Sequence, residues 1–341
     1  MAIRIMIPLC LATLLFLRGS LAVADADNPP VKIIFDTDMD SDCDDVGALA
    51  MLHALTNRGE AEILATVCST KSLGAAQCVD AINTWFNRPN LPLGAPKANA
   101  VSQQSKYAKQ IAAEYPHDLK PDGVPDAMDV YRNVLSKQPD NSVVIVTVGD
   151  LTNIANLLKL PATDRQPSGI DLVKSKVKQW VCMGGNFIGR PAKDDMKLGN
   201  NNFSLDKTSS LYAVQNWPIE LTFVGREIGS VPSGLKAGAR LKELPEKNIV
   251  RRAYALYFGG EPKDRHLADQ TTVLYAVRGL RDYWEIEKSG TMDLQPDMTF
   301  TWRAGGGKQN HLLKRSIDGK PNDREIEKVI EALMMHEPKE K

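Results

Sequence analysis

Runs of β-branched and aromatic residues alternate with helical hydrophobic spacing along most of the chain. Val31–Phe35 is a run of this kind that ends abruptly in acidic residues, as expected of a buried strand, and Val46–Leu55 follows with helical spacing. Further strands are predicted at Glu62–Val67, Ser142–Val148, Lys178–Met183 and Ile219–Val224, and further helices at Ala75–Phe86, Leu151–Leu160, Lys247–Tyr257 and Gln270–Val277. This alternation predicts an α/β fold, with an open, mainly parallel sheet covered by helices on both faces, in a single domain over residues 30–341.

Both ends of the chain depart from this alternation. Asp293–Arg303 predicts a short antiparallel addition to the sheet, and Asn322–Met335 has the apolar stripe of an amphipathic helix that packs on the core. At the start, a basic Met1–Arg4, an apolar Ile5–Leu17 and the small residues before Asp25 form the pattern of a signal peptide, cleaved after position 24. The apolar run is shorter than the roughly 20 residues that span a bilayer. We therefore expect residues 1–24 to be removed and the protein to be exported, to the periplasm or outside the cell, without a membrane anchor.

Net charge limits the kinds of ligand that fit the chain, and cysteine content limits the role of disulfides. Lys+Arg and Asp+Glu are both 42, so no net charge attracts nucleic acid or an anionic membrane, and a small-molecule substrate fits better. Four cysteines remain after cleavage, which permits disulfides but does not make a disulfide scaffold. They are Cys43, Cys68, Cys78 and Cys182.

An acidic segment separates the first predicted strand from the first helix, where open α/β sheets place their ligands. Six of the ten residues in 36–45 are aspartates: Asp36, Asp38, Asp40, Asp42, Asp44 and Asp45. Without a cation, such crowding is repulsive and raises the pKa of several carboxyls. Ca²⁺ accepts six to eight oxygen ligands and relieves this repulsion. The segment therefore predicts a site for a hard divalent cation.

Other interpretations of the acidic segment are weaker. An EF-hand loop requires Gly at its sixth and Glu at its twelfth position, where this chain has Ser41 and Gly47. Helix capping suits Asp44 and Asp45 but does not explain six acids. Phosphoryl transfer by an aspartyl nucleophile and a purely structural metal site remain as less favoured alternatives to metal-dependent hydrolysis.

The segment from Phe35-Asp36-Thr37-Asp38 through Asp44-Asp45 and on to Ala50 resembles the inosine-uridine nucleoside hydrolase family, in a bacterial branch whose acidic loop is two residues longer. The resemblance extends over roughly Lys32 to Gly279. It implies the nucleoside hydrolase fold and hydrolysis of the N-glycosidic bond of ribonucleosides or related ribosides, through an oxocarbenium-like state. Members of the family are often oligomers, so the resemblance allows a homo-oligomer.

Two later motifs resemble the same family, Val148–Ala155 and Ala268–Tyr275. By this resemblance a Ca²⁺ ion is held by Asp38, Asp45, Asp269 and the backbone carbonyl of Val148. Asp38 also has the role of the base that takes a proton from water, and Asp44 that of a partner of a ribose hydroxyl.

The sugar-binding and leaving-group positions match the family less well. In the stretch from Met183-Gly184-Gly185-Asn186 to Asp206, Asn202 matches a ribose-binding Asn, but Asn200 stands where the family has Glu. Thr70 stands where the family often has a ribose-binding Asn, and Ala268 stands where purine-specific members often have His. His266, Arg190 and Trp180 are the candidates to contact the base instead. These departures leave open a modified riboside as substrate, or a non-catalytic nucleoside or sugar binder.

Overall fold

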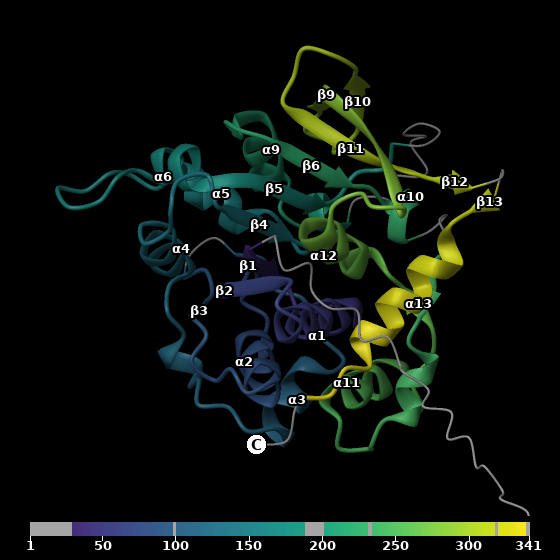
Figure 1. Ribbon diagram of the computed structural model, residues 1–341. Helices are drawn as coiled ribbons and strands as arrows, with labels where there is room; N and C mark the ends of the chain where they lie inside the picture. Colours follow the sequence, from purple (N-terminus) through teal and green to yellow (C-terminus); the bar gives the residue numbers. More distant parts are fainter. Residues whose placement is uncertain (1–28, 98–99, 188–200, 231–233, 318–319, 339–341) are drawn as a thin grey trace, which may run out of the picture.

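Nine strands form one mainly parallel sheet, in the order β10-β9-β11-β6-β5-β4-β1-β2-β3 (Figure 1). The computed structural model describes residues 29–97, 100–187, 201–230, 234–317 and 320–338. The strands are β1 Val31–Thr37, β2 Ala61–Cys68, β3 Leu93–Gly94, β4 Val143–Thr147, β5 Val177–Met183, β6 Leu221–Val224, β9 Trp284–Leu294, β10 Phe300–Arg303 and β11 Gln309–Lys314. In this sheet only β9 runs in the opposite direction, and it pairs antiparallel with both of its neighbours, β10 and β11. Two short pairs lie outside it, β7 Lys236–Ala237 with β8 Arg265–His266, and β12 Ser316–Ile317 with β13 Lys320–Pro321.

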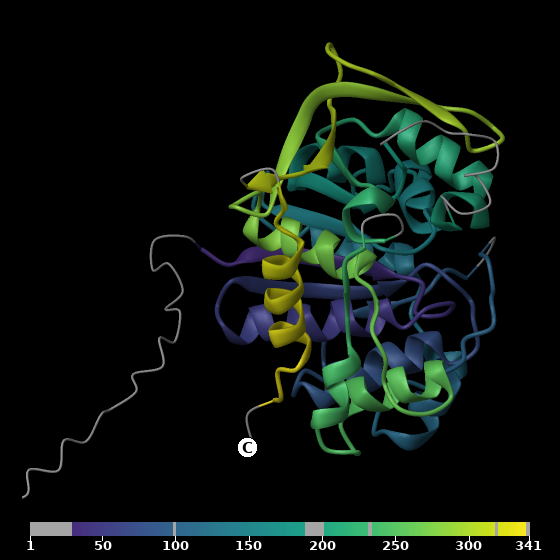
Figure 2. The same ribbon diagram turned by 90° about the vertical axis from the view of Figure 1, so that its right-hand side faces the viewer.

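Helices cover both faces of the sheet, each over its own apolar core (Figures 1 and 2). One layer contains α1 Asp44–Asn57, α2 Ala75–Trp85, α3 Ala108–Glu114, α11 Ile249–Phe258, α12 Ala268–Arg278 and α13 Asp323–Met334. The other contains α4 Ala127–Leu135, α5 Thr152–Lys159, α6 Gly169–Lys176 and α9 Lys207–Asn216. The short helices are α8 Asn201–Leu205, α10 Arg226–Gly229, η1 Pro121–Gly123 and η2 Ala239–Glu243. The predicted α/β sheet with helices on both faces is confirmed.

The predicted strands and helices lie within a few residues of the observed ones, but the tail is larger than the sequence indicated. The antiparallel addition expected at Asp293–Arg303 is the end of an eleven-residue strand, β9, together with β10. Strand β11, which the pattern did not predict, enters between β9 and β6 and pairs parallel to β6. Its sequence, Gln-Asn-His-Leu-Leu-Lys, does not alternate between apolar and polar residues, so the pattern gave no sign of a strand. The polar side chains of Asn310 and His311 are nevertheless buried, because Thr222 and Glu287 are their partners in the folded chain.

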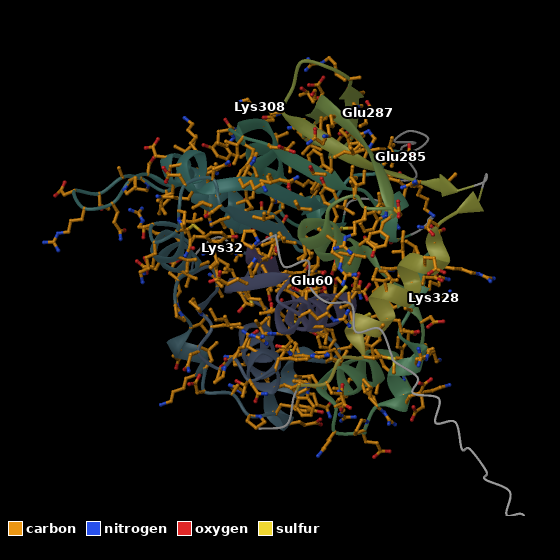
Figure 3. All side chains as sticks on the ribbon, viewed as in Figure 1. Lys32, Glu60, Glu285, Glu287, Lys308 and Lys328 are labelled. Carbon is orange, nitrogen blue, oxygen red and sulfur yellow. The ribbon has the colours of Figure 1, made fainter. Side chains whose placement is uncertain are left out.

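Helix α12 is anchored at its C-terminal end by a partly buried ion pair. Glu60 is labelled in Figure 3. The guanidinium of Arg278 donates from Nε and Nη2 to both of its carboxylate oxygens, at 2.6 and 2.8 Å. Two parallel bonds of this kind fix orientation as well as distance. Glu60 lies in the turn before β2, so the pair ties α12 to the chain that follows α1, against which α12 packs. The N-terminal end of α12, which carries Asp269, is thereby held at the edge of the sheet.

The four cysteines that remain after position 24 are buried and not bonded to one another. Among the described residues, no helix combines the length and the apolar character needed to cross a membrane.

At Gly149 the segment after β4 passes close to the residue after β1. A Cβ atom at this position would lie 2.5 Å from the backbone nitrogen of Asp38 and 2.8 Å from the hydroxyl oxygen of Ser69. Backbone atoms cannot rotate away as a side chain can, so the absence of a side chain lets the segment after β4 pass directly beside the residue after β1.

We expect Gly149→Ala to lower the free energy of unfolding by about 1–3 kcal/mol, the usual cost of overpacking, and to reduce activity by displacing Asp38. Urea denaturation and a turnover assay measure the two effects. Gly260→Ala is the matched control, because a Cβ there meets nothing within 4 Å. Equal stability of the two variants would contradict the close approach.

Candidate active site

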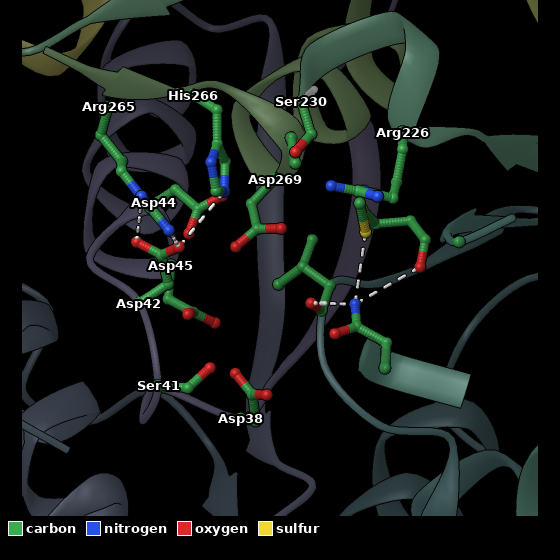
Figure 4. Close-up of a pocket in the computed structure, with 15 residues that line it drawn as sticks. Asp38, Ser41, Asp42, Asp44, Asp45, Arg226, Ser230, Arg265, His266 and Asp269 are labelled. Atoms are coloured by element: carbon green, nitrogen blue, oxygen red, sulfur yellow. Dashed lines mark hydrogen bonds and ion pairs between the residues drawn. The ribbon is translucent and has the colours of Figure 1, made fainter. Parts of the chain in front are cut away.

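The C-terminal ends of four parallel strands, β1, β4, β5 and β6, meet the first turns of α1 and α12 at one edge of the sheet. A cavity of about 260 Å³ lies there (Figure 4). Its walls are Asp38, Ser41, Asp42, Asp44, Asp45, Val148, Met183, Gly184, Asn202, Arg226, Ser230, Arg265, His266, Ala268 and Asp269. This is the position at which open α/β sheets bind ligands.

Four buried carboxylates surround one side of the cavity. Asp38, Asp44, Asp45 and Asp269 are each at most 5% exposed. Oxygen atoms of Asp44, Asp45 and Asp269 lie within 4.8 Å of one another, although Asp269 is more than 200 residues further along the chain. Asp44 and Asp45 are in the first turn of α1, and Asp269 is in the first turn of α12. Two helix N-termini, each with a partial positive charge, therefore point toward the acids.

This confinement raises the pKa of each carboxyl. Burial is the largest cause for Asp38, Asp45 and Asp269, and the charges of the neighbouring aspartates add to it. The pKa of Asp44 is raised by burial and by the charge of Asp42. Such shifts mean that the ionised cluster is unfavourable without a counter-charge. The site is therefore built to gain stability from a cation.

Two of the six aspartates in the acidic segment do not line the cavity. Asp36 is fully buried in β1 and accepts hydrogen bonds from Tyr131 Oη at 2.6 Å and from Asn153 Nδ2. Asp40 accepts from Ser72 Oγ at 2.8 Å and from the side-chain amide of Gln103. Asp36 and Asp40 therefore bond to the residues around the cavity, and only the other four aspartates of the segment line it.

The acidic loop has a fixed backbone. Met39, which is buried, has a φ of 48°, a left-handed conformation that costs free energy for a residue with a Cβ. Its backbone N–H lies 3.2 Å from both Thr37 Oγ1 and Asp45 Oδ1, and the Thr37 hydroxyl also donates to Asp45. Tyr107 donates to the carbonyl of Asp42 at 2.6 Å. These bonds orient Asp45 toward the cavity.

The carbonyl of Val148 faces the cavity from the end of β4. It accepts a hydrogen bond from Asn202 Nδ2 at 2.8 Å, and the same amide group also lies 3.3 Å from the sulfur of Met183. A carbonyl oxygen has two lone pairs, so this bond leaves room for a second partner. Asn202 therefore lies beside the predicted metal-binding carbonyl as well as on the cavity wall.

On the other side, His266 lies between two acids. Its Nε2 is 3.2 Å from Asp42 and 3.3 Å from Asp44. Burial lowers the pKa of His266, but the two carboxylates outweigh burial and raise it to about 9. Asp42 also accepts hydrogen bonds from Arg265, with its Nε at 2.8 and 2.9 Å, and the two cations hold the pKa of Asp42 below its ordinary value against the effect of burial.

The remaining predicted residues lie elsewhere. Thr70 is buried outside the cavity wall, where its hydroxyl bonds Ser72 and the carbonyl of Val101. Asn186 is also not on the wall, and its side-chain oxygen is buried without a partner among the described residues. Trp180 is fully buried in β5 and donates to Thr147, so it does not face the base as suggested. Asn200 and Arg190 fall outside the described residues.

Sequence reasoning missed Asp42 and Arg265 as a pair, and it missed Arg226 and Ser230. Arg226 lies two residues after the end of β6, as Gly149 does after the end of β4, and Asp38 directly follows β1. The rule that ligands bind at the carboxyl ends of parallel strands pointed to this position. The contact of Asp42 with Arg265 spans 223 residues and leaves no local pattern.

The cluster of Asp38, Asp45 and Asp269 fits a hard divalent cation. Its donors are all oxygens and are buried, and Asp38 lines the same cavity as the other two. The carboxylate oxygens that lie within 4.8 Å of one another are those of Asp45, Asp269 and Asp44, and Asp44 already contacts His266. The Asp42, Asp44 and His266 group also brings three ligand atoms together, but its histidine is already held as a cation between the two acids. The three carboxylates are therefore the better metal site.

We expect His266 to contribute at most about 3 kcal/mol to stability at neutral pH, from a pKa raised from its ordinary 6.5 to about 9. Because the folded-state pKa is raised, this contribution is fully present below about pH 6.5 and is lost as the pH rises through about 9. Urea denaturation of the wild type and of His266→Gln, both with chelator, should give curves that converge over this range. His117→Gln, whose ring contacts the carbonyl of Ala112, is the control, and a difference independent of pH would contradict the ion pair.

Comparison with known proteins places this geometry in a family. The model of the inosine-uridine preferring nucleoside hydrolases matches residues 33–318. No curated protein sequence matches the chain.

Solved structures with the same fold include an inosine-uridine preferring nucleoside hydrolase from Bacillus anthracis. It is 15% identical in sequence, with a TM-score of 0.62, and the superposition covers 89% of this chain and 99% of that one. A purine-preferring ribonucleoside hydrolase from Gardnerella vaginalis is 14% identical, with a TM-score of 0.62 and coverage of 89% and 98%. A plant nucleoside hydrolase is 16% identical, with a TM-score of 0.63 and coverage of 90% and 99%. With a family match over most of its length and this fold, the chain belongs to the inosine-uridine preferring nucleoside hydrolase family and is an N-glycosyl hydrolase of the nucleosidase type.

Proposed function

We propose that this nucleoside hydrolase uses a bound Ca²⁺ ion to hydrolyse the N-glycosidic bond of ribonucleosides or close relatives to a free base and ribose. One observation carries the proposal. Buried carboxylates that are far apart in the sequence, Asp38 and Asp45 on one side and Asp269 on the other, line one cavity, and their charges raise one another's pKa.

Asp38, Asp45, Asp269 and the carbonyl of Val148 are the proposed ligands. All are oxygen donors, as Ca²⁺ prefers, and the cavity leaves room for water and sugar hydroxyls to complete its larger coordination number. When bound, the cation supplies the positive charge that the cluster lacks and makes a nearby water more acidic.

Asp38 is the proposed general base. It follows directly after β1, so its position is fixed by the sheet and by the close approach of Gly149. Water adds to the anomeric carbon, its proton passes to Asp38, and the electron pair of the C–N bond leaves with the base. The surrounding carboxylates favour the positive charge that develops on the sugar in the transition state.

Asp44 and His266 form the proposed leaving-group side. Asp44 accepts from a ribose hydroxyl through the carboxylate oxygen that His266 leaves available. His266 is cationic at neutral pH because of Asp42 and Asp44, and it lines the cavity as a proton donor to the departing base. The longer acidic loop, which includes Asp42, would thus contribute to catalysis, because Asp42 keeps the imidazole of His266 protonated.

Of the other predicted sugar contacts, only Asn202 lines the cavity in the described structure, next to the carbonyl of Val148. We assign it to a ribose hydroxyl. Export through a cleaved signal peptide is proposed from the sequence, and residues 1–24 lie outside the described part of the chain.

We expect purified protein with Ca²⁺ to release ribose from at least one of inosine, uridine, adenosine and guanosine, and to lose this activity with excess chelator. Asp38→Asn should lower kcat by about 10²–10⁴-fold, the usual contribution of a positioned general base. A matched 2′-deoxynucleoside should be a poor substrate, because it lacks one of the hydroxyls that reach the cluster. Release of no ribose from any of the four would rule out ordinary nucleosides as substrates.

Calcium binding has a readout that does not require turnover. At a concentration about 100-fold above its Kd, the ion should stabilise the fold by about 2.7 kcal/mol and raise Tm by roughly 5 °C or more. Asp269→Asn should abolish the shift, whereas Asp122→Asn, an exposed aspartate far along the chain from the cluster, should retain it. A calcium-dependent shift that survives in Asp269→Asn would place the ion elsewhere.

A further inference from the structure

The cavity has cations on two sides, and they are held differently. Arg265 and His266 lie on the side of α1 and contact the acids Asp42 and Asp44. Arg226 enters from the opposite side, at the end of β6, and its guanidinium extends into the cavity beside Ser230 (Figure 4). Asp269 lies between the two sides (Figure 4). The cavity therefore offers positive charge at both ends of a bound sugar.

The backbone holds Arg226 in place. Its N–H donates to the carbonyl of Gly185 at 2.9 Å, and its carbonyl accepts from the N–H of Ser230 at 2.7 Å. The next residue, Glu227, is buried, and its carboxylate accepts from the N–H of Phe187 at 3.2 Å. These bonds join the ends of β5 and β6, so a guanidinium placed on them is preorganised for a ligand.

The direction of the sugar follows from the proposed function, on which this inference rests. Asp44 and His266 mark the side of the anomeric carbon and the leaving base. The opposite end of the ring, which carries C4′ and C5′, then points toward Val148, Asn202 and Arg226. A 5′ substituent of the riboside would meet Arg226 and the hydroxyl of Ser230.

We propose that Arg226 and Ser230 bind an anionic phosphate on C5′, so that the preferred substrates are ribosides with a 5′-phosphate. A neutral 5′-hydroxyl does not call for a charged donor, whereas the planar guanidinium matches phosphate oxygens through two parallel N–H bonds. Arginine has five N–H donors, so phosphate binding is compatible with its other contacts. The phosphate takes no part in bond breaking. Water adds to C1′, the base leaves with the C–N electron pair and gains a proton, and ribose 5-phosphate is the second product.

Kinetics on a matched substrate pair tests this inference. We expect wild-type protein to have a lower KM for inosine 5′-monophosphate than for inosine. Arg226→Gln should raise the KM for the monophosphate about tenfold or more, the effect of losing a hydrogen bond between charged groups, and should change the KM for inosine much less. Arg226→Lys should restore part of the effect, since it keeps the charge but not the fork. Arg303→Gln, on the exposed strand β10, is the control for general loss of an arginine.

Binding separates the two proposals. Calorimetry on the calcium-loaded protein should show tighter binding of ribose 5-phosphate than of ribose or of inorganic phosphate, and Arg226→Gln should remove the advantage of ribose 5-phosphate over ribose. Hydrolysis of inosine without any preference for the 5′-phosphate in either assay would overturn the role of Arg226 and leave the proposed function standing. Arg226-dependent binding of ribose 5-phosphate without turnover of either substrate would overturn the proposed hydrolysis and retain the phosphate site. Inorganic phosphate binding as tightly as ribose 5-phosphate would overturn the riboside and reduce the site to an anion site.

Discussion

The confinement of like charges around one cavity is the constraint on which the rest of the site depends. Asp38, Asp44, Asp45 and Asp269 are buried together, and burial and mutual repulsion raise the pKa of each. The fold tolerates this arrangement because it directs the N-termini of α1 and α12 at the acids and gives Asp45 a hydroxyl and a backbone donor. These partial charges reduce the repulsion without cancelling it. A cation bound at the cluster would relieve the repulsion that remains, so the proposed metal binding would also stabilise the fold.

The sequence predicted the parts of this arrangement that are local. A buried run that stops at Asp36, followed by helical spacing from Val46, located a strand end and a helix start with acids between them. A parallel sheet then implies that other strand ends, such as the one before Gly149, lie at the same edge. The observed sheet and the match over residues 33–318 confirm the fold and the family.

What the sequence could not predict is which acids share the cavity. Asp36 and Asp40 look like the other members of the segment, but their partners Tyr131 and Ser72 lie far away in the chain and reach them only after folding. The same applies to β11, whose buried polar residues do not follow a strand's alternation. Arg226 could have been predicted in part, because a residue that follows a parallel strand is expected to face a ligand. Its direction into the cavity could not, because that depends on the bonds between the ends of β5 and β6.

The arrangement of the cations decides where a metal ion belongs. Asp42 comes from the acidic segment, and Arg265 and His266 come from β8, so Asp42 and Asp44 together with the two cations form a group without net charge. Asp44 shares His266 and is partly balanced in the same way. Among the described residues this leaves Asp38, Asp45 and Asp269 as the carboxylates without an ion pair, although they are as deeply buried as the balanced ones. Asp42 therefore does more than add to the acidic segment. It holds a protonated imidazole on one side of the cavity and leaves the excess negative charge at the other carboxylates, where we propose that a divalent cation binds.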